Sequence, residues 1–174
     1  MASQLSDGTI YFIGGIYANR VFDDGSFATT TLKLDPNLSI SFKAPMQASR
    51  WLHSTQVVKD RYIIVMGGNQ LRSYRPYQHM TEVECYDTAT DQWLTIDSLP
   101  QTCGKYVAST VINSRIVFAM PDLKDDYKEF FRLDVGSEAE YHSTMNSGLS
   151  VIARKRWTPF TIYSPVLCSL ISGI

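Results

Sequence analysis

The strongest structural signal in the sequence is YIIVMGG, residues 62–68. A run of mostly apolar, strand-forming residues stops abruptly at two glycines, the residues least suited to a strand. IYFIGG, residues 10–15, makes the same change earlier in the chain. The two glycine pairs begin at Gly14 and Gly67, which are 67 − 14 = 53 residues apart. A fixed period of that size indicates a repeated structural unit.

The segments that flank the two glycine pairs also align. Each pair is followed by a polar loop and then by a β-branched segment, TTTLKLD at 29–35 and TEVECYD at 81–87. The aspartates that end these segments, Asp35 and Asp87, are 87 − 35 = 52 residues apart. STQVVKD, residues 54–60, adds a strand before the second glycine pair. The sequence therefore predicts four short strands in each unit, separated by turns.

A third unit follows in weaker form, with Met120-Pro121 at the place of the glycines. Its four strands are expected at residues 106–114, 115–122, 128–135 and 139–145. The first unit is expected to enter at its second strand, DGTIYFIGG, and so to lack its own first strand. Near the end of the chain, WTPFTIYSPVL at 157–167 offers only a poor substitute for that missing strand.

Four short strands repeated about every fifty residues are typical of a β-propeller blade. The central unit resembles a kelch repeat, because Gly67-Gly68 are followed by Tyr86 and Trp93 with six residues between them. We expect Tyr86 and Trp93 to pack between blades. We expect the glycines to lie where the second strand meets a crowded central axis and turns outward, often with φ > 0.

The first unit departs from this pattern. It keeps the glycine pair, Gly14-Gly15, but Leu34 and Ser41 stand where tyrosine and tryptophan are expected, with Phe42 adjacent. APMQASRWLH, residues 44–53, resembles the kelch passage from one blade to the next. The resemblance implies an all-β fold, a partial kelch-type β-propeller of about three four-stranded blades.

The repeats are expected at 7–50, 51–103 and 104–147, with 148–174 as a partial repeat or a C-terminal tail. Propellers typically need four to eight blades to close, so three blades leave open strand edges that favour association. Three explanations stay open: a piece of a longer propeller, an open array, or pairing with another chain. Pairing of two identical chains gives about six blades.

Composition limits the classes of partner. Lysine plus arginine number 16 and aspartate plus glutamate 17, so the charge balance favours neither nucleic acid nor an anionic membrane. The three cysteines have no CxxC spacing, which indicates a reducing compartment rather than a disulfide framework or zinc knuckle. No secretory signal or apolar run of about 20 residues is present. We expect a soluble, cytoplasmic protein.

No catalytic, metal or cofactor site is predicted. The histidines, His53, His79 and His142, are unevenly spaced and form no HxH or HExxH motif. Some kelch-like propellers are enzymes, either sugar mutarotases or copper radical oxidases. A fragment of such an enzyme is the alternative reading, but the histidine spacing does not suit copper and three blades do not enclose a sugar pocket.

A binding role is predicted from the loops that follow the glycine pairs. NQLRSYRPYQHM, residues 69–80, is expected to be a solvent-facing loop rich in tyrosine and arginine, residue types enriched at interface hot spots. The resemblance implies that these loops share one face with the passages between blades and bind peptides or protein surfaces, as in ubiquitin-ligase substrate recruitment or actin binding. The predicted partner-binding residues are Arg20, Phe22, Arg50, Trp51, Arg72, Tyr74, Arg75 and Tyr77.

Overall fold

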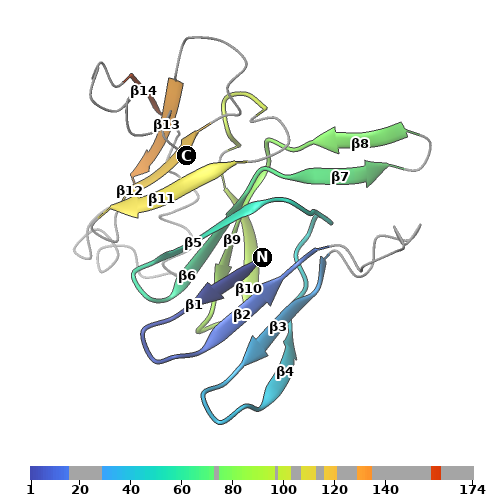
Figure 1. The fold of residues 1–174 in the computed structure, drawn as a ribbon, viewed down its shortest axis with the longest axis vertical. Helices are drawn as coiled ribbons and strands as arrows, with labels where there is room; N and C mark the ends of the chain where they lie inside the picture. Colours follow the sequence, from blue (N-terminus) through green and yellow to red (C-terminus); the bar gives the residue numbers. More distant parts are fainter. Residues whose placement is uncertain are drawn as a thin grey trace, which may run out of the picture.

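The computed structural model of the chain describes residues 1–15, 29–72, 75–96, 98–102, 107–112, 116–120, 129–134 and 158–161. These residues form an all-β structure of antiparallel strands (Figure 1). Three four-stranded sheets follow one another along the chain, and a separate two-stranded hairpin extends from the second sheet. The predicted all-β class is therefore confirmed.

Each of the three sheets is a meander in which strands that follow one another pair side by side. The first sheet contains β1 (Ala2–Gln4), β2 (Ile10–Ile13), β3 (Thr31–Leu34) and β4 (Ile40–Lys43). The second sheet contains β5 (Ser54–Val58), β6 (Tyr62–Met66), β9 (Val83–Asp87) and β10 (Gln92–Ile96). The third sheet contains β11 (Ala108–Ile112), β12 (Ile116–Met120), β13 (Glu129–Asp134) and β14 (Thr158–Thr161). The hairpin of β7 (Asn69–Arg72) and β8 (Arg75–His79) is inserted between β6 and β9.

Two strands differ from the sequence prediction. The first sheet has its own first strand, because β1 pairs with β2 through Ala2 and Phe12; this three-residue strand carries no apolar alternation that would reveal it. In the third sheet, β14 pairs with β13 through Phe160 and Phe130 and supplies the fourth strand. The sequence placed that strand at 139–145, which lies outside the described residues. The sheets thus extend beyond residues 7–147 at both ends.

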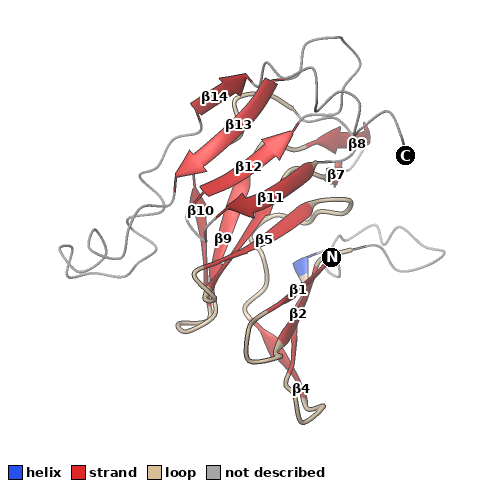
Figure 2. Ribbon diagram, turned by 60° about the vertical axis from the view of Figure 1, so that its left-hand side comes forward, coloured by secondary structure: helices blue, strands red, loops and turns tan. Residues whose placement is uncertain are grey.

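The first strands of the three sheets lie next to one another. β5 contacts both β1 and β11, and Figure 2 shows β5 between them. Polar side chains join these strands: Ser3 donates to Thr55 Oγ1 at 2.9 Å, and Gln56 Nε2 donates to the Ser109 carbonyl at 2.8 Å. The Ser54 and Ser109 hydroxyls also share a hydrogen bond. The first strands of the sheets therefore form the edge at which the three sheets meet. The sequence prediction of second strands at this place is wrong.

The apolar core fills the two spaces between the three sheets. β6 is buried along its whole length, because Ile63 and Val65 pack toward the first sheet while Ile64 and Met66 pack toward the third. A strand covered on both faces has no polar alternation, which explains the continuous apolar run YIIVM.

The first two sheets are joined by aromatic packing and by hydrogen bonds. The Tyr86 ring is fully buried, lies edge-on to Tyr11 at 5.6 Å between ring centroids, and lies 5.0 Å from the Trp93 ring. Trp93 Nε1 donates to the Ala44 carbonyl at 2.7 Å, and the Ala44 N–H donates to Asp91 at 2.9 Å. This segment after β4 is thereby fixed to the turn between β9 and β10.

Strand register changes one alignment made from the sequence. Trp93 pairs with Tyr86 across the second sheet, and Ile40 pairs with Leu34 across the first. Ile40, rather than Ser41, therefore stands at the position that Trp93 occupies in the second sheet.

The second glycine pair meets both of the demands that glycine satisfies. Gly67 and Gly68 have φ values of 63° and 85°, in the left-handed region. A Cβ on Gly67 would lie 2.2 Å from Val107 Cγ2, and one on Gly68 would lie 2.6 Å from the Trp51 carbonyl oxygen. The crowding comes from the segments that lead into the second and third sheets and not from a central axis.

Candidate functional site

The antiparallel order gathers several connections at one end of the sheets. β6 ends at Met66, which pairs with Ser54 at the start of β5. The hairpin that follows β6 and the connection 44–53 that precedes β5 therefore lie at this end, which we call the hairpin end. The turns after β3 and β9 lie at the opposite end, since those strands run in the reverse direction.

The segment 69–80 is a β-hairpin rather than the open loop that the sequence suggested. Asn69 pairs with His79 and Arg72 with Arg75, with an irregularity in register after Gln70. Figure 1 shows β7 and β8 projecting away from the three sheets. The hairpin therefore offers a strand pair to the surroundings while its base stays attached to the second sheet.

Asn69 anchors the base of the hairpin. Its backbone exchanges two hydrogen bonds with Trp51, at 3.0 Å and 2.8 Å, and its side chain, only 1% exposed, contacts His79 Nδ1 through Oδ1 at 2.7 Å. On the other strand, the Met80 N–H donates to the Gly68 carbonyl at 2.9 Å. These bonds fix the direction in which the hairpin leaves the sheet.

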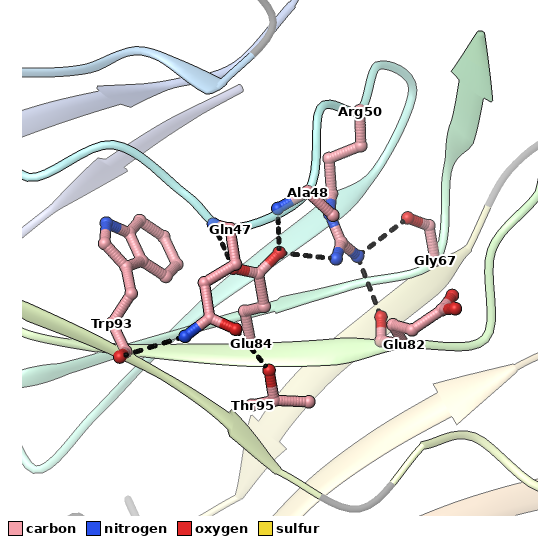
Figure 3. A network of polar contacts seen from close by, with 8 residues as sticks. All are labelled: Gln47, Ala48, Arg50, Gly67, Glu82, Glu84, Trp93 and Thr95. Atoms are coloured by element: carbon pink, nitrogen blue, oxygen red, sulfur yellow. Dashed lines mark hydrogen bonds and ion pairs between the residues drawn. The ribbon is translucent and has the colours of Figure 1, made fainter. Parts of the chain in front are cut away.

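A buried ion pair supports the same region (Figure 3). Arg50 and Glu84 are both almost fully buried, and Arg50 Nη2 lies 2.7 Å from Glu84 Oε1. Arg50 Nη1 also donates to the carbonyls of Gly67 at 3.2 Å and of Glu82 at 2.8 Å. Burial lowers the pKa of Arg50, and the Glu84 carboxylate opposes that shift. Arg50 thus joins the connection 44–53 to the strand ends from which the hairpin leaves.

Glu84 also binds the backbone of the connection. Its carboxylate accepts the N–H of Gln47 at 2.7 Å and of Ala48 at 3.3 Å. The Gln47 side chain in turn accepts from Thr95 Oγ1 at 2.8 Å. Because a buried charge needs such partners, the whole set keeps the hairpin base in one arrangement.

His53 completes the buried surroundings of the base. It is 2% exposed and packs so closely to Gly68 that an added Cβ there would lie 2.9 Å from His53 Cβ. Burial, the nearby amino group of Met1 and the charge of Arg50 lower the pKa of His53 to about 3. His53 is therefore neutral near pH 7 and adds no charge beside Arg50.

The structure separates the predicted partner-binding residues into three groups. Trp51 is half-buried beside the hairpin base. Arg72, Arg75 and Tyr77 belong to the hairpin strands. Arg20, Phe22 and Tyr74 lie outside the described residues.

Arg50 requires a correction. Its guanidinium is fully buried against Glu84, so it has no surface to offer a partner. Its role in the structure is to hold the connection 44–53 on the second sheet.

Sequence reasoning missed Glu84 and Asn69. Glu84 interrupts an otherwise apolar run, VECY, and a carboxylate at a buried strand position signals a buried counter-charge. Asn69 directly follows the glycine pair, but nothing in the sequence indicates that its side chain is buried.

Three observations describe the chemistry of the described residues. Among them, no group of three histidine, cysteine or carboxylate side chains is arranged to hold a metal ion. The same part of the chain contains no helix that is long and apolar enough to cross a membrane. Cys85 is buried, and burial raises the pKa of its thiol, so it is not a reactive nucleophile.

Comparison with known proteins gives a likeness of fold. No protein-family model and no curated protein sequence matches the chain. Among solved structures, the chain is similar to the one titled "Structure of YjhT", with a TM-score of 0.56 and 14% sequence identity. The match covers 93% of this chain and 49% of the other, so the chain spans about half the length of that protein.

Proposed function

We propose that the chain forms consecutive blades of a kelch-type β-propeller and acts as a non-catalytic module that binds a protein or peptide at its hairpin end. Support for the propeller comes from three successive four-stranded meanders with adjacent first strands. The likeness in fold to part of a longer chain agrees with this arrangement. In each blade, the connection before the first strand and the one after the second strand then lie at the hairpin end.

The observation that carries the binding role is a projecting hairpin on a rigid base. The hairpin extends beyond the sheets, whereas its base is held by Asn69 and by the buried Arg50–Glu84 pair. A rigid support reduces the ordering cost of binding. Arginine and tyrosine, which the hairpin carries at Arg72, Arg75 and Tyr77, are the residue types that commonly dominate interface energies.

The test combines three substitutions in the hairpin, Arg72→Glu, Arg75→Glu and Tyr77→Ala. A photoreactive amino acid at position 77 first identifies a partner by cross-linking and mass spectrometry, and its affinity is then measured with purified proteins. We expect binding to weaken by at least about 30-fold, since a hot-spot residue contributes about 2 kcal/mol or more. Circular dichroism and the melting temperature should change little.

Substitutions at the opposite end provide the control. Asn37→Glu and Gln92→Glu alter exposed residues of the first and second sheets away from the hairpin end, and we expect them to leave affinity unchanged. Equal affinity of the triple hairpin variant and the wild-type chain would refute the proposed site. So would equal losses of affinity in the hairpin and control variants.

A further inference from the structure

One face of the first sheet is largely apolar, and none of the described residues covers it. Cross-strand pairing places alternate residues of all four strands on this face, which we call the outer face. Its exposed members include Phe42, 80% exposed, Ile40, 69%, and Phe12, 44%. The complete set is Ala2, Gln4, Ile10, Phe12, Leu32, Leu34, Ile40 and Phe42. None of these residues is buried, and none carries an ionisable side chain.

The second sheet shows what covers a face of this kind. Ile63, Val65 and Tyr86 stand at the positions that Ile10, Phe12 and Leu34 occupy in the first sheet. In the second sheet this face is buried against the first sheet. The natural cover for the outer face is therefore another four-stranded sheet of the same array.

That cover uses the opposite face of the neighbouring sheet. The first sheet covers the second with Tyr11 and Ile13, together with Met46 from the following connection. The second sheet meets the third in the same way, using Ile64 and Met66. Each sheet thus covers its successor with the same pair of β-strand positions.

The corresponding face of the third sheet is exposed along β11. In β11, the alternate residues Ala108, Thr110 and Ile112 are exposed, Ile112 by 46%. Strand register pairs Thr110 with Phe118 and Ala108 with Met120 in β12, and these two β12 residues correspond to Ile64 and Met66 of the second sheet. The same face carries Arg132 of β13, which pairs with Phe118. Among the described residues, the outer face of the first sheet and the β11 part of this face are therefore exposed at opposite ends of the array.

We propose that the outer face of one copy packs against the third sheet of a second copy, head to tail, so that two chains close a ring. This inference rests on the proposed propeller fold. Three sheets from each of two chains give 3 + 3 = 6 blades, within the usual range of four to eight, whereas three chains would give nine. A closed ring uses the contact twice and leaves no face uncovered.

The composition of the outer face favours an apolar contact. Its residue at the place of Glu84 is Leu32, so it has no carboxylate to receive an arginine from a preceding connection. The first and second sheets are linked through the covalent connection 44–53, which supplies Arg50. In a contact between separate chains, no covalent connection brings an arginine to the interface. A carboxylate at the position of Glu84 is therefore not needed there.

Sedimentation analysis of the purified chain tests this proposal. We expect a species of about twice 19.7 kDa. Phe42→Glu should remove it and raise the dissociation constant on the order of 100-fold, because it buries an unpaired charge. Leu38→Glu is the matched control, since Leu38 is 79% exposed but lies in the turn beyond β3. That variant should remain dimeric, and both should keep the wild-type circular dichroism spectrum.

A mixing experiment separates a head-to-tail ring from a face-to-face dimer. Ile112→Glu should also abolish the dimer, because it places a charge on the opposite contact face. A mixture of Phe42→Glu and Ile112→Glu chains should recover a 1:1 heterodimer, in which one of the two contacts is wild type at both faces. A face-to-face dimer would instead tolerate Ile112→Glu.

Several outcomes would overturn the inference. They are a monomeric wild-type chain, a dimer unaffected by Phe42→Glu, one that tolerates Ile112→Glu, or no heterodimer on mixing. Sedimentation does not depend on the hairpin, so the triple hairpin variant should remain dimeric. Failure of this inference is therefore distinct from failure of the proposed binding function.

Discussion

The outer face of the first sheet and the equivalent face of the second differ sharply in composition. Positions occupied by Leu32 and Ile40 in the first sheet hold Glu84 and Trp93 in the second. The second-sheet face is covered by a neighbour that is linked through a covalent connection, and its polar atoms bind that connection. Apart from Gln4, the first-sheet face is apolar, and among the described residues no connection binds to it.

The difference shows that one backbone plan carries two kinds of contact. Where a connection crosses the interface, its backbone N–H groups and Arg50 must be satisfied in a buried space, and Glu84 provides the acceptors. Where no connection crosses, hydrophobic side chains suffice. The polar residues of the second sheet therefore satisfy this particular connection. At the contact between the second and third sheets, Phe131 stands at the place of Glu84 and packs in an apolar cluster.

The largest expected effect comes from giving the second sheet the residue of the first, with Glu84→Leu. Arg50 would then be buried without its counter-charge, and such a loss commonly costs about 3 to 5 kcal/mol. The free energy of unfolding in urea at pH 7 measures this change. The matched control is Glu82→Leu, because the Glu82 side chain is exposed and only its carbonyl binds Arg50. We expect a change of about 0.5 kcal/mol or less there.

A double variant sharpens the interpretation of that result. Arg50→Met combined with Glu84→Leu removes both charges, so it should be more stable than Glu84→Leu alone. If the free energy of unfolding of Glu84→Leu lies within about 1 kcal/mol of the wild-type value, the buried pair does not hold the connection on the second sheet.

A smaller effect is expected at the aromatic position. Trp93→Ala should lower the free energy of unfolding by about 2 to 3 kcal/mol, below the range for fully buried aromatics, because the indole is only partly buried. Ile40→Ala, the equivalent change in the first sheet, should cost about 0.5 kcal/mol or less in the monomer, because Ile40 is 69% exposed. Thermal denaturation at low protein concentration measures both. Equal losses in the two variants would mean that the two faces are equally covered.

The sequence predicted the parts of the fold that repeat. Glycine period and strand alternation indicated an all-β chain with four strands per unit, which the sheets show. It failed where the signal is not periodic. β1 is too short to show alternation, and β14 lies far from β13 in sequence. Strand register decides whether Ile40 or Ser41 stands at the position equivalent to Trp93. Register depends on turn geometry, which the sequence alone does not show, so the sequence alignment is wrong by one residue.

The candidate site was predicted only in outline. Tyrosine and arginine after the glycine pair marked the hairpin segment, but its strand pairing was not foreseen. The local sequence predicts a surface position for Arg50, because its partner, Glu84, lies 34 residues away in sequence. Burial of a charged residue depends on such a distant partner, so it is not visible from the local sequence.

Of the losses of stability expected around the second sheet, the smallest concerns pH. The buried His53 lies directly before this sheet, whereas the outer face of the first sheet carries no ionisable side chain. His53 has a folded-state pKa of about 3, lowered chiefly by burial, whereas an unfolded histidine has a pKa of about 6.5. Between about pH 6.5 and pH 3, His53 is therefore protonated in the unfolded state but neutral in the folded state. Stability therefore falls as the pH decreases from about 6.5 toward 3.

The expected loss at pH 5 is about 2 kcal/mol relative to pH 8, taken from 1.36 kcal/mol per pKa unit between pH 6.5 and 5. Urea unfolding at several pH values measures it, and His53→Gln, which does not titrate, should remove this part of the slope. His79 and His142 are unchanged in the variant, so the difference between the two slopes belongs to His53. Nuclear magnetic resonance of the folded chain gives a direct check, because the His53 ring should not titrate between pH 8 and 5. A His53 pKa near 6.5 in the folded state would contradict a buried, neutral histidine beside the hairpin base.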